Sequence, residues 1–84
     1  MADLSKSVRA DLRVAIAGLG PIGKRVAEAL DQGMDGLALV AVSVQHPEKH
    51  RSWLSGLTRA PAILPIDALC DVADIVIEIG RAHV

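Results

Sequence analysis

A glycine-rich turn constrains the fold of this chain more than any other feature. Residues 14–23 read VAIAGLGPIG, so an apolar run leads directly into the spacing G-x-G-x-x-G, and a helical pattern follows. This arrangement is typical of a strand that turns sharply into a helix within a β-α-β unit. A β-α-β unit in turn requires a parallel sheet with a right-handed crossover.

Strands alternate with helices along the rest of the chain. Apolar and β-branched runs predict strands at 12–18, 37–44, 62–64 and 74–78. The second run is apolar throughout, as expected for a strand buried on both faces. The third is flanked by Pro61 and Pro65, as expected at a sheet edge. The predicted fold class is α/β: a partial doubly wound, Rossmann-type parallel sheet of about four strands in the order 3-2-1-4.

Helices are predicted from periodicity and from proline and glycine signals, at about 21–31, 46–57 and 66–70. Gly33 and Gly36 are expected to end the first helix and turn the chain. The apolar face of this helix is predicted to comprise Ile22, Val26, Ala29 and Leu30. The apolar face of the second helix is predicted to comprise His50, Trp53, Leu54 and Leu57.

The glycine turn predicts a dinucleotide-binding site. Gly18 would permit the tight turn, Gly20 would let the backbone approach a pyrophosphate, and Gly23 would let the helix pack closely. Free N–H groups and the helix dipole favour phosphate at such a helix start. Pro21 removes one possible donor there, so the Ile22 N–H is the expected contact. The plainer interpretation is that the glycines only end a strand and begin a helix.

The end of the second predicted strand leaves the choice of cofactor open. NAD-selective sites place an acidic residue about 20 residues beyond the glycines, where it binds the adenosine ribose. Residues 43–46 read SVQH instead, so Ser43 or Gln45 would bond a ribose hydroxyl. Lys49 and Arg51 are near enough to meet a 2′-phosphate, or they form an ordinary solvated helix face. The predicted cofactor is therefore NAD or NADP.

Other reactive side chains predict neither a catalytic site nor a metal site. His46 and His50 are four residues apart, but HPEKH is not H-E-x-x-H and no third ligand is evident. We therefore expect both histidines to be solvent-facing or half-buried. Cys70 lacks a basic neighbour and is predicted to be a small core residue. The aspartates around the last strand are predicted to be capping and loop residues: Asp67, Asp71 and Asp74.

Composition excludes several classes of partner. The 84 residues are 51% hydrophobic with Trp53 as the one aromatic residue, which predicts an aliphatic core. A net charge of −1 without a basic run argues against nucleic acid or a membrane surface as a partner. A single cysteine excludes an internal disulfide and suits the reducing cytoplasm. No apolar run approaches the length of a transmembrane helix.

Residues 13–78 resemble the amino-terminal domain of the L-aspartate dehydrogenase family. The resemblance rests on VAIAGLGPIG at 14–23, LVAVS at 39–43, HPEK at 46–49, LPIDAL at 64–69 and DIVIE at 74–78. It implies oxidative deamination of L-aspartate to oxaloacetate or iminoaspartate with NAD or NADP, in a homo-oligomeric enzyme linked to NAD biosynthesis. It also implies that Gly18, Gly20 and Gly23, and less directly Ile22, contact the cofactor.

The expected organisation is a flexible leader at 1–11, a partial dinucleotide-binding domain at 12–78 and a non-native tail at 79–84. The tail reads IGRAHV, the translation of ATC GGA AGA GCA CAC GTC, which matches a common sequencing adapter. The resemblance places the catalytic residues in a second domain that is absent here. No catalytic residue is therefore assigned, and the chain is expected to be inactive alone.

Three functions remain open at this point. The chain is a fragment of an amino-acid dehydrogenase, a stand-alone nucleotide-binding or sensing module, or a fragment of another oxidoreductase of this fold, such as homoserine dehydrogenase. The predicted partner is a dinucleotide cofactor, and the resemblance implies a small amino-acid substrate for the full-length enzyme. A sensing module is expected to close its own sheet, whereas this chain ends in or just after its fourth predicted strand, which favours the first function.

Overall fold

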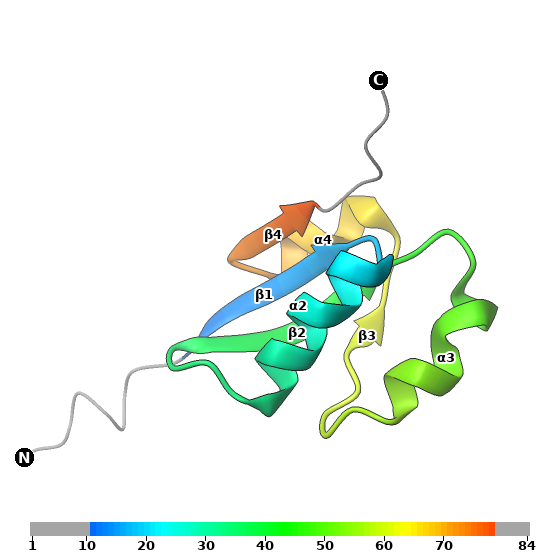
Figure 1. The fold of residues 1–84 in the computed structure, drawn as a ribbon. Helices are drawn as coiled ribbons and strands as arrows, with labels where there is room; N and C mark the ends of the chain where they lie inside the picture. The colour runs from blue at the N-terminus through cyan, green and yellow to red at the C-terminus, as the bar shows by residue number, and fades with distance from the viewer. Residues whose placement is uncertain (1–10, 79–84) are drawn as a thin grey trace, which may run out of the picture.

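The computed structural model describes residues 11–78, which form a parallel sheet with helices on both faces (Figure 1). Along the chain the elements are β1 (Leu12–Ala17), α2 (Pro21–Gln32), β2 (Leu37–Ser43), α3 (Pro47–Ser55), β3 (Ala62–Ile63), α4 (Ile66–Val72) and β4 (Ile75–Glu78). The strand order β3-β2-β1-β4 confirms the predicted order and the α/β fold class. The predicted leader, except Asp11, and the predicted tail lie outside the described residues.

Each face of the sheet carries its own apolar cluster. One cluster joins β1 and β2 to α2 and α3, and its buried members are Val14, Ile16, Leu19, Ala27, Leu30, Val42 and Leu54. The other joins the same two strands to α4 through Ala15, Ala17, Ala41 and Leu69. Successive side chains of a strand point to opposite faces, so β1 contributes to both clusters. Both clusters are aliphatic, as the composition predicts.

An irregularity in β2 adjusts its register against β1. Val14 pairs with Leu39, but the next residue, Ala15, pairs with Ala41, so Val40 is an extra residue in β2. Val40 and Ala41 both pack with the α4 cluster, whereas Leu39 packs with the α2 cluster. Because of this bulge, two successive residues of β2 point to the α4 face, and the alternation of side chains between the two faces shifts by one residue. Simple alternation along the sequence does not predict this shift.

The buried stripe of α2 differs from the predicted one. Gly23, Ala27 and Leu30 are buried, whereas Ile22 is 65% exposed and Ala29 is exposed. The prediction was right for Leu30, which is buried, and for Val26, which packs half-buried against the cluster, and wrong for Ile22 and Ala29. At Gly23 a larger side chain is excluded, because an added Cβ would lie 2.5 Å from the Gly18 carbonyl oxygen.

On the α4 side, the prediction for Cys70 was wrong, and Asp74 makes a contact that was not predicted. Cys70 is exposed, because the buried position of α4 belongs to its neighbour Leu69, about 100° away around the helix. Asp74 lies in the loop before β4, as predicted, and its carboxylate accepts hydrogen bonds from the Arg13 backbone N–H at 2.8 Å and the Arg13 guanidinium at 2.9 and 3.2 Å. This pair joins the start of β1 to the start of β4.

The two outer strands form the edges of the sheet. β3 is short and lies at one edge, as its flanking prolines predict. β4 lies at the other edge, where Ile75 is 39% exposed and Val76 is 36% exposed. Within residues 11–78, no helix is long and apolar enough to cross a bilayer.

Candidate functional site

The carboxyl ends of three strands meet at one position of the sheet. Ala17, the last residue of β1, pairs with Ser43 of β2 on one side and with Glu78 of β4 on the other. The Gly18 N–H donates to the Ser43 carbonyl oxygen at 2.9 Å, which extends the β1–β2 ladder into the turn. In open parallel sheets this edge, beside the reversal of strand order, is where ligands bind. Here the reversal lies between β1 and β4.

Two glycines of the turn are required by the protein itself. Gly18 has a φ of 108°, a conformation that residues with a Cβ rarely adopt. At Gly23, an added Cβ would lie 2.5 Å from the Gly18 carbonyl oxygen. Because that oxygen belongs to the backbone, the first turn of α2 would have to move away from β1 to make room. Gly18 and Gly23 therefore act as a pair that brings α2 close to the end of β1.

Gly20 is different, because nothing in the described protein requires a glycine there. Its φ of −75° is open to any residue, and an added Cβ would meet no atom within 4 Å. The space in front of this residue is free and lies directly before the helix. A bare backbone facing free space fits the close approach of a pyrophosphate, the role that the sequence predicts for Gly20.

The start of α2 offers hydrogen-bond donors to an anion. Gly20 is the N-cap and provides no side-chain cap, Pro21 is the first helical residue, and the first turn carries no acidic side chain. The Lys24 N–H donates to the Gly20 carbonyl oxygen at 2.9 Å and begins the helical ladder. The N–H groups of Ile22 and Gly23 precede that ladder and have no intrahelical partner. These donors and the uncompensated helix dipole suit a phosphate.

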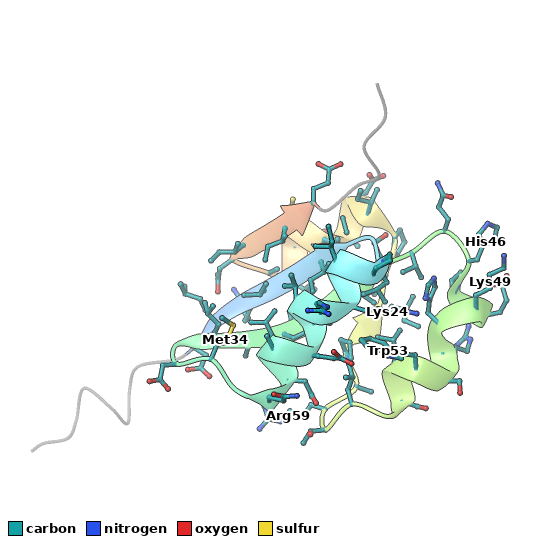
Figure 2. The ribbon with its side chains drawn as sticks, viewed as in Figure 1. Lys24, Met34, His46, Lys49, Trp53 and Arg59 are labelled. Atoms are coloured by element: carbon teal, nitrogen blue, oxygen red, sulfur yellow. The ribbon has the colours of Figure 1, made fainter. Side chains whose placement is uncertain are left out.

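The connection from β2 to α3 borders the same edge. Ser43 is half-buried beside Ala17, while Gln45 and His46 are exposed. His46 precedes α3, and its Nδ1 lies 3.6 Å from a Glu48 carboxylate oxygen. Figure 2 shows His46 and Lys49 together at the start of α3. His46 therefore lies next to Lys49 at the end of the β2–α3 connection. From the sequence, His46 was weighed only as a possible metal ligand.

The remaining candidate residues contribute less to this edge. Arg51 is exposed on α3. His50 is half-buried, as predicted, and its Nδ1 has no hydrogen-bond partner among the described residues. Across residues 11–78, no three His, Cys, Asp or Glu side chains come together in a group that would hold a metal ion.

Two side chains on α2 make contacts that the sequence analysis missed. The Lys24 ammonium lies 5.4 Å from the centre of the Trp53 ring in α3. The Asp31 carboxylate accepts the backbone N–H groups of Thr58 at 2.9 Å and Arg59 at 3.2 Å, which lowers the pKa of Asp31. Lys24 and Asp31 are seven residues apart, about two helical turns, and that spacing is the sequence signal for one shared flank.

Comparison with known proteins decides the family. A family model described as "Homoserine dehydrogenase, NAD binding domain" matches residues 18–84, most of the chain and all three glycines of the turn. The chain belongs to this family of NAD-binding domains. The parallel sheet and the free helix start described above are the architecture on which such domains place a dinucleotide.

Three curated relatives of this NAD-binding domain carry the name L-aspartate dehydrogenase. The protein from Bradyrhizobium diazoefficiens is 56% identical over 87% of this chain. L-aspartate dehydrogenase 3 from Bordetella bronchiseptica is 39% identical over 93% of it, and the Methanocella arvoryzae protein is 32% identical over 79%. The alignments cover 26%, 29% and 24% of those proteins, so the chain spans about a quarter of their length. No solved structure matches the chain.

Proposed function

We propose that this chain binds NAD with the pyrophosphate at the start of α2. The observation that carries the proposal is the open space at Gly20, in a turn whose other two glycines are needed by the fold. The Ile22 and Gly23 N–H groups would donate to the phosphate oxygens, and Pro21 would hold the helix start rigid. Ser43 and Gln45 would bond the adenosine ribose. Bound NAD supplies a two-electron acceptor for a dehydrogenase.

We further propose that the whole protein oxidatively deaminates L-aspartate, giving iminoaspartate or oxaloacetate. The 56% identity to the Bradyrhizobium protein named L-aspartate dehydrogenase supports this. Within residues 11–78 we assign no catalytic residue; the charged or titratable side chains beside the turn are the exposed Glu78, His46, Glu48 and Lys49. Catalysis is left to residues outside this chain. Such an enzyme would act in the cytoplasm as a homo-oligomer and would supply iminoaspartate to NAD biosynthesis.

The experiment compares this chain with the complete product of its gene. We expect the chain to bind NAD⁺ in a calorimetric titration and to produce no NADH when L-aspartate is added. The complete protein should reduce NAD⁺ with L-aspartate. Turnover by this chain alone would contradict the assignment of catalysis to another part of the protein.

A second candidate substrate is homoserine, because the matching family model is described from homoserine dehydrogenase. The two amino acids separate the candidates in one assay. L-aspartate as the preferred substrate supports the first proposal, and L-homoserine supports the second. If the gene product ends with this sheet and reduces NAD⁺ with neither, the chain is a nucleotide-binding or sensing module.

We also propose that the site accepts NADP as well as NAD. No acidic residue stands at the end of β2 or in residues 44–47, and His46 and Lys49 lie together at the start of α3, where Glu48 is the one neighbouring carboxylate. The Lys49 ammonium would attract the extra negative charge, and the His46 ring would donate an N–H hydrogen bond to it. Equal or better binding of NADP⁺ than NAD⁺ would support this choice.

A further inference from the structure

We propose that Lys24 and Asp31 are positioning residues that clamp α3 to α2 and so set the geometry of the adenosine side of the site. The proposal rests on the NAD-binding function proposed above and adds residues that make no contact with the cofactor. Both residues lie on α2, on the flank that faces α3 and the loop after it. The clamp has an upper point near the glycine turn and a lower point at the far end of α2.

The upper point is the contact between Lys24 and Trp53. The Lys24 ammonium lies 5.4 Å from the centre of the indole ring, within the range of a cation–π interaction. Figure 2 shows the two side chains pointing toward one another between the helices. Lys24 sits in the second turn of a helix whose dipole disfavours a cation near that end, so the electron-rich ring face offers it a compensating partner.

The lower point is the Asp31 carboxylate. It accepts two consecutive backbone N–H groups, Thr58 at 2.9 Å and Arg59 at 3.2 Å, just beyond the end of α3. One carboxylate therefore holds the loop that leaves α3 toward β3. Figure 2 places Arg59 beside the lower end of α2, which agrees with this contact.

Side-chain contacts of this kind matter for α3 because the helix has little other attachment. Leu54 is its one buried residue, while Trp53 in the helix and Leu57, two residues beyond its end, are only half-buried against the cluster. The connection 44–46, which carries Gln45 and His46, is fixed by β2 at one end and by α3 at the other. A shift of α3 therefore moves the side chains that border the adenosine half of the cofactor, while the glycine turn keeps its own support from β1.

The first test measures the clamp without any ligand. Amide hydrogen exchange is followed in Lys24→Met, which keeps the aliphatic stem and removes the charge, and in Asp31→Ala. We expect exchange within 47–55 to become roughly threefold faster in the first variant and roughly fivefold faster in the second, with β1 unchanged. Lys24→Arg should restore protection, because a guanidinium also stacks on an aromatic ring.

The matched controls are Arg25→Met and Glu28→Ala, which remove the same charges at exposed positions of α2 and should leave exchange in α3 unchanged. Unchanged exchange in α3 of Lys24→Met and Asp31→Ala overturns the proposal.

The second test measures positioning through ligand affinity. Asp31→Ala removes a negative charge, so a purely electrostatic effect would strengthen binding of an anion. The clamp predicts the opposite for NAD⁺, roughly threefold weaker binding, while inorganic pyrophosphate binds as in the wild type. Unchanged or tighter NAD⁺ binding, or an equal loss for both ligands, contradicts a positioning role. Failure of the wild-type chain to bind NAD⁺ refutes the proposed function, and the exchange experiment still decides the clamp.

Discussion

The two connections at the carboxyl edge of the sheet are built on different physical principles. The β1–α2 turn is held by backbone: Gly18 has a left-handed conformation, its N–H bonds to Ser43, and Gly23 approaches its carbonyl oxygen. The β2–α3 connection has no glycine and depends on where α3 lies. That helix is held by one buried leucine and by side chains from α2.

This difference matches what each connection has to recognise. A pyrophosphate is the same in every dinucleotide, so a rigid backbone cradle serves it. The ribose end distinguishes NAD from NADP, and side chains on a separately anchored helix can change without disturbing the cradle. The four predictions that follow test this contrast, from the largest expected effect to the smallest.

The largest effect is expected from Leu54→Ala. Leu54 is 3% exposed and is the buried attachment of α3 to the cluster shared with β1 and β2. Its truncation should lower the free energy of unfolding by about 2–5 kcal/mol, as measured by urea denaturation. Leu57→Ala, at a half-buried position two residues beyond the end of the helix, should cost less. Equal costs for the two would show that α3 does not depend on this single residue.

Gly23→Ala tests the backbone-held turn. The new Cβ would lie 2.5 Å from the Gly18 carbonyl oxygen, so the helix start must shift. Alanine favours helix, which offsets part of this cost. We expect a net loss of about 1–3 kcal/mol in urea denaturation. A gain in stability would mean that α2 can move away from β1 freely, and that the turn is not the rigid member of the pair.

Acid should weaken the end of the sheet opposite the site. The Arg13 guanidinium and backbone N–H hold the pKa of Asp74 at about 2, below its ordinary value of 3.8. A depressed folded-state pKa means that this contribution is full above pH 3.8 and is lost as the pH falls toward 2. Thermal unfolding followed against pH should show this loss in the wild type and a flatter curve in Asp74→Asn. At neutral pH, the variant should keep its NAD⁺ affinity, because Asp74 lies away from the turn.

The smallest effect is expected at the β2–α3 connection. Lys49→Met should reduce affinity for NADP⁺ by roughly threefold and leave NAD⁺ affinity unchanged, because an exposed charge adds little. Arg51→Met is the matched control, since Arg51 is exposed on the same helix. Equal losses for both cofactors in a titration would show that Lys49 does not meet the 2′-phosphate.

The sequence predicted the sheet well because local signals determined it. The glycine turn, the apolar runs and the prolines around β3 give the strand order that the structure confirms. The inward face of α2 was predicted only in part: Leu30 is buried as expected, but Gly23 faces inward because of its close approach to the Gly18 carbonyl oxygen, which hydrophobicity does not reveal. The placement of Cys70 failed for a related reason: periodicity in a helix of two turns does not decide which of two adjacent apolar residues is buried.

The contacts at Lys24, Asp31 and Asp74 could not be predicted, because each joins residues far apart in sequence. Arg13 and Asp74 meet only once β4 has paired with β1. Asp31 meets Thr58 only after α3 has docked. Single charged residues carry no periodic signal, so tertiary packing alone reveals their partners.

Gly20→Ser tests the central claim most directly, that the free space at this residue receives a dinucleotide pyrophosphate. Serine is favoured at an N-cap and nothing lies within 4 Å of the new Cβ, so the free energy of unfolding should stay equal or rise. In a calorimetric titration against the wild-type chain, NAD⁺ affinity should fall by about tenfold or more, because the Cβ occupies the approach of the pyrophosphate. A stable Gly20→Ser chain that binds NAD⁺ as tightly as the wild type would contradict this placement.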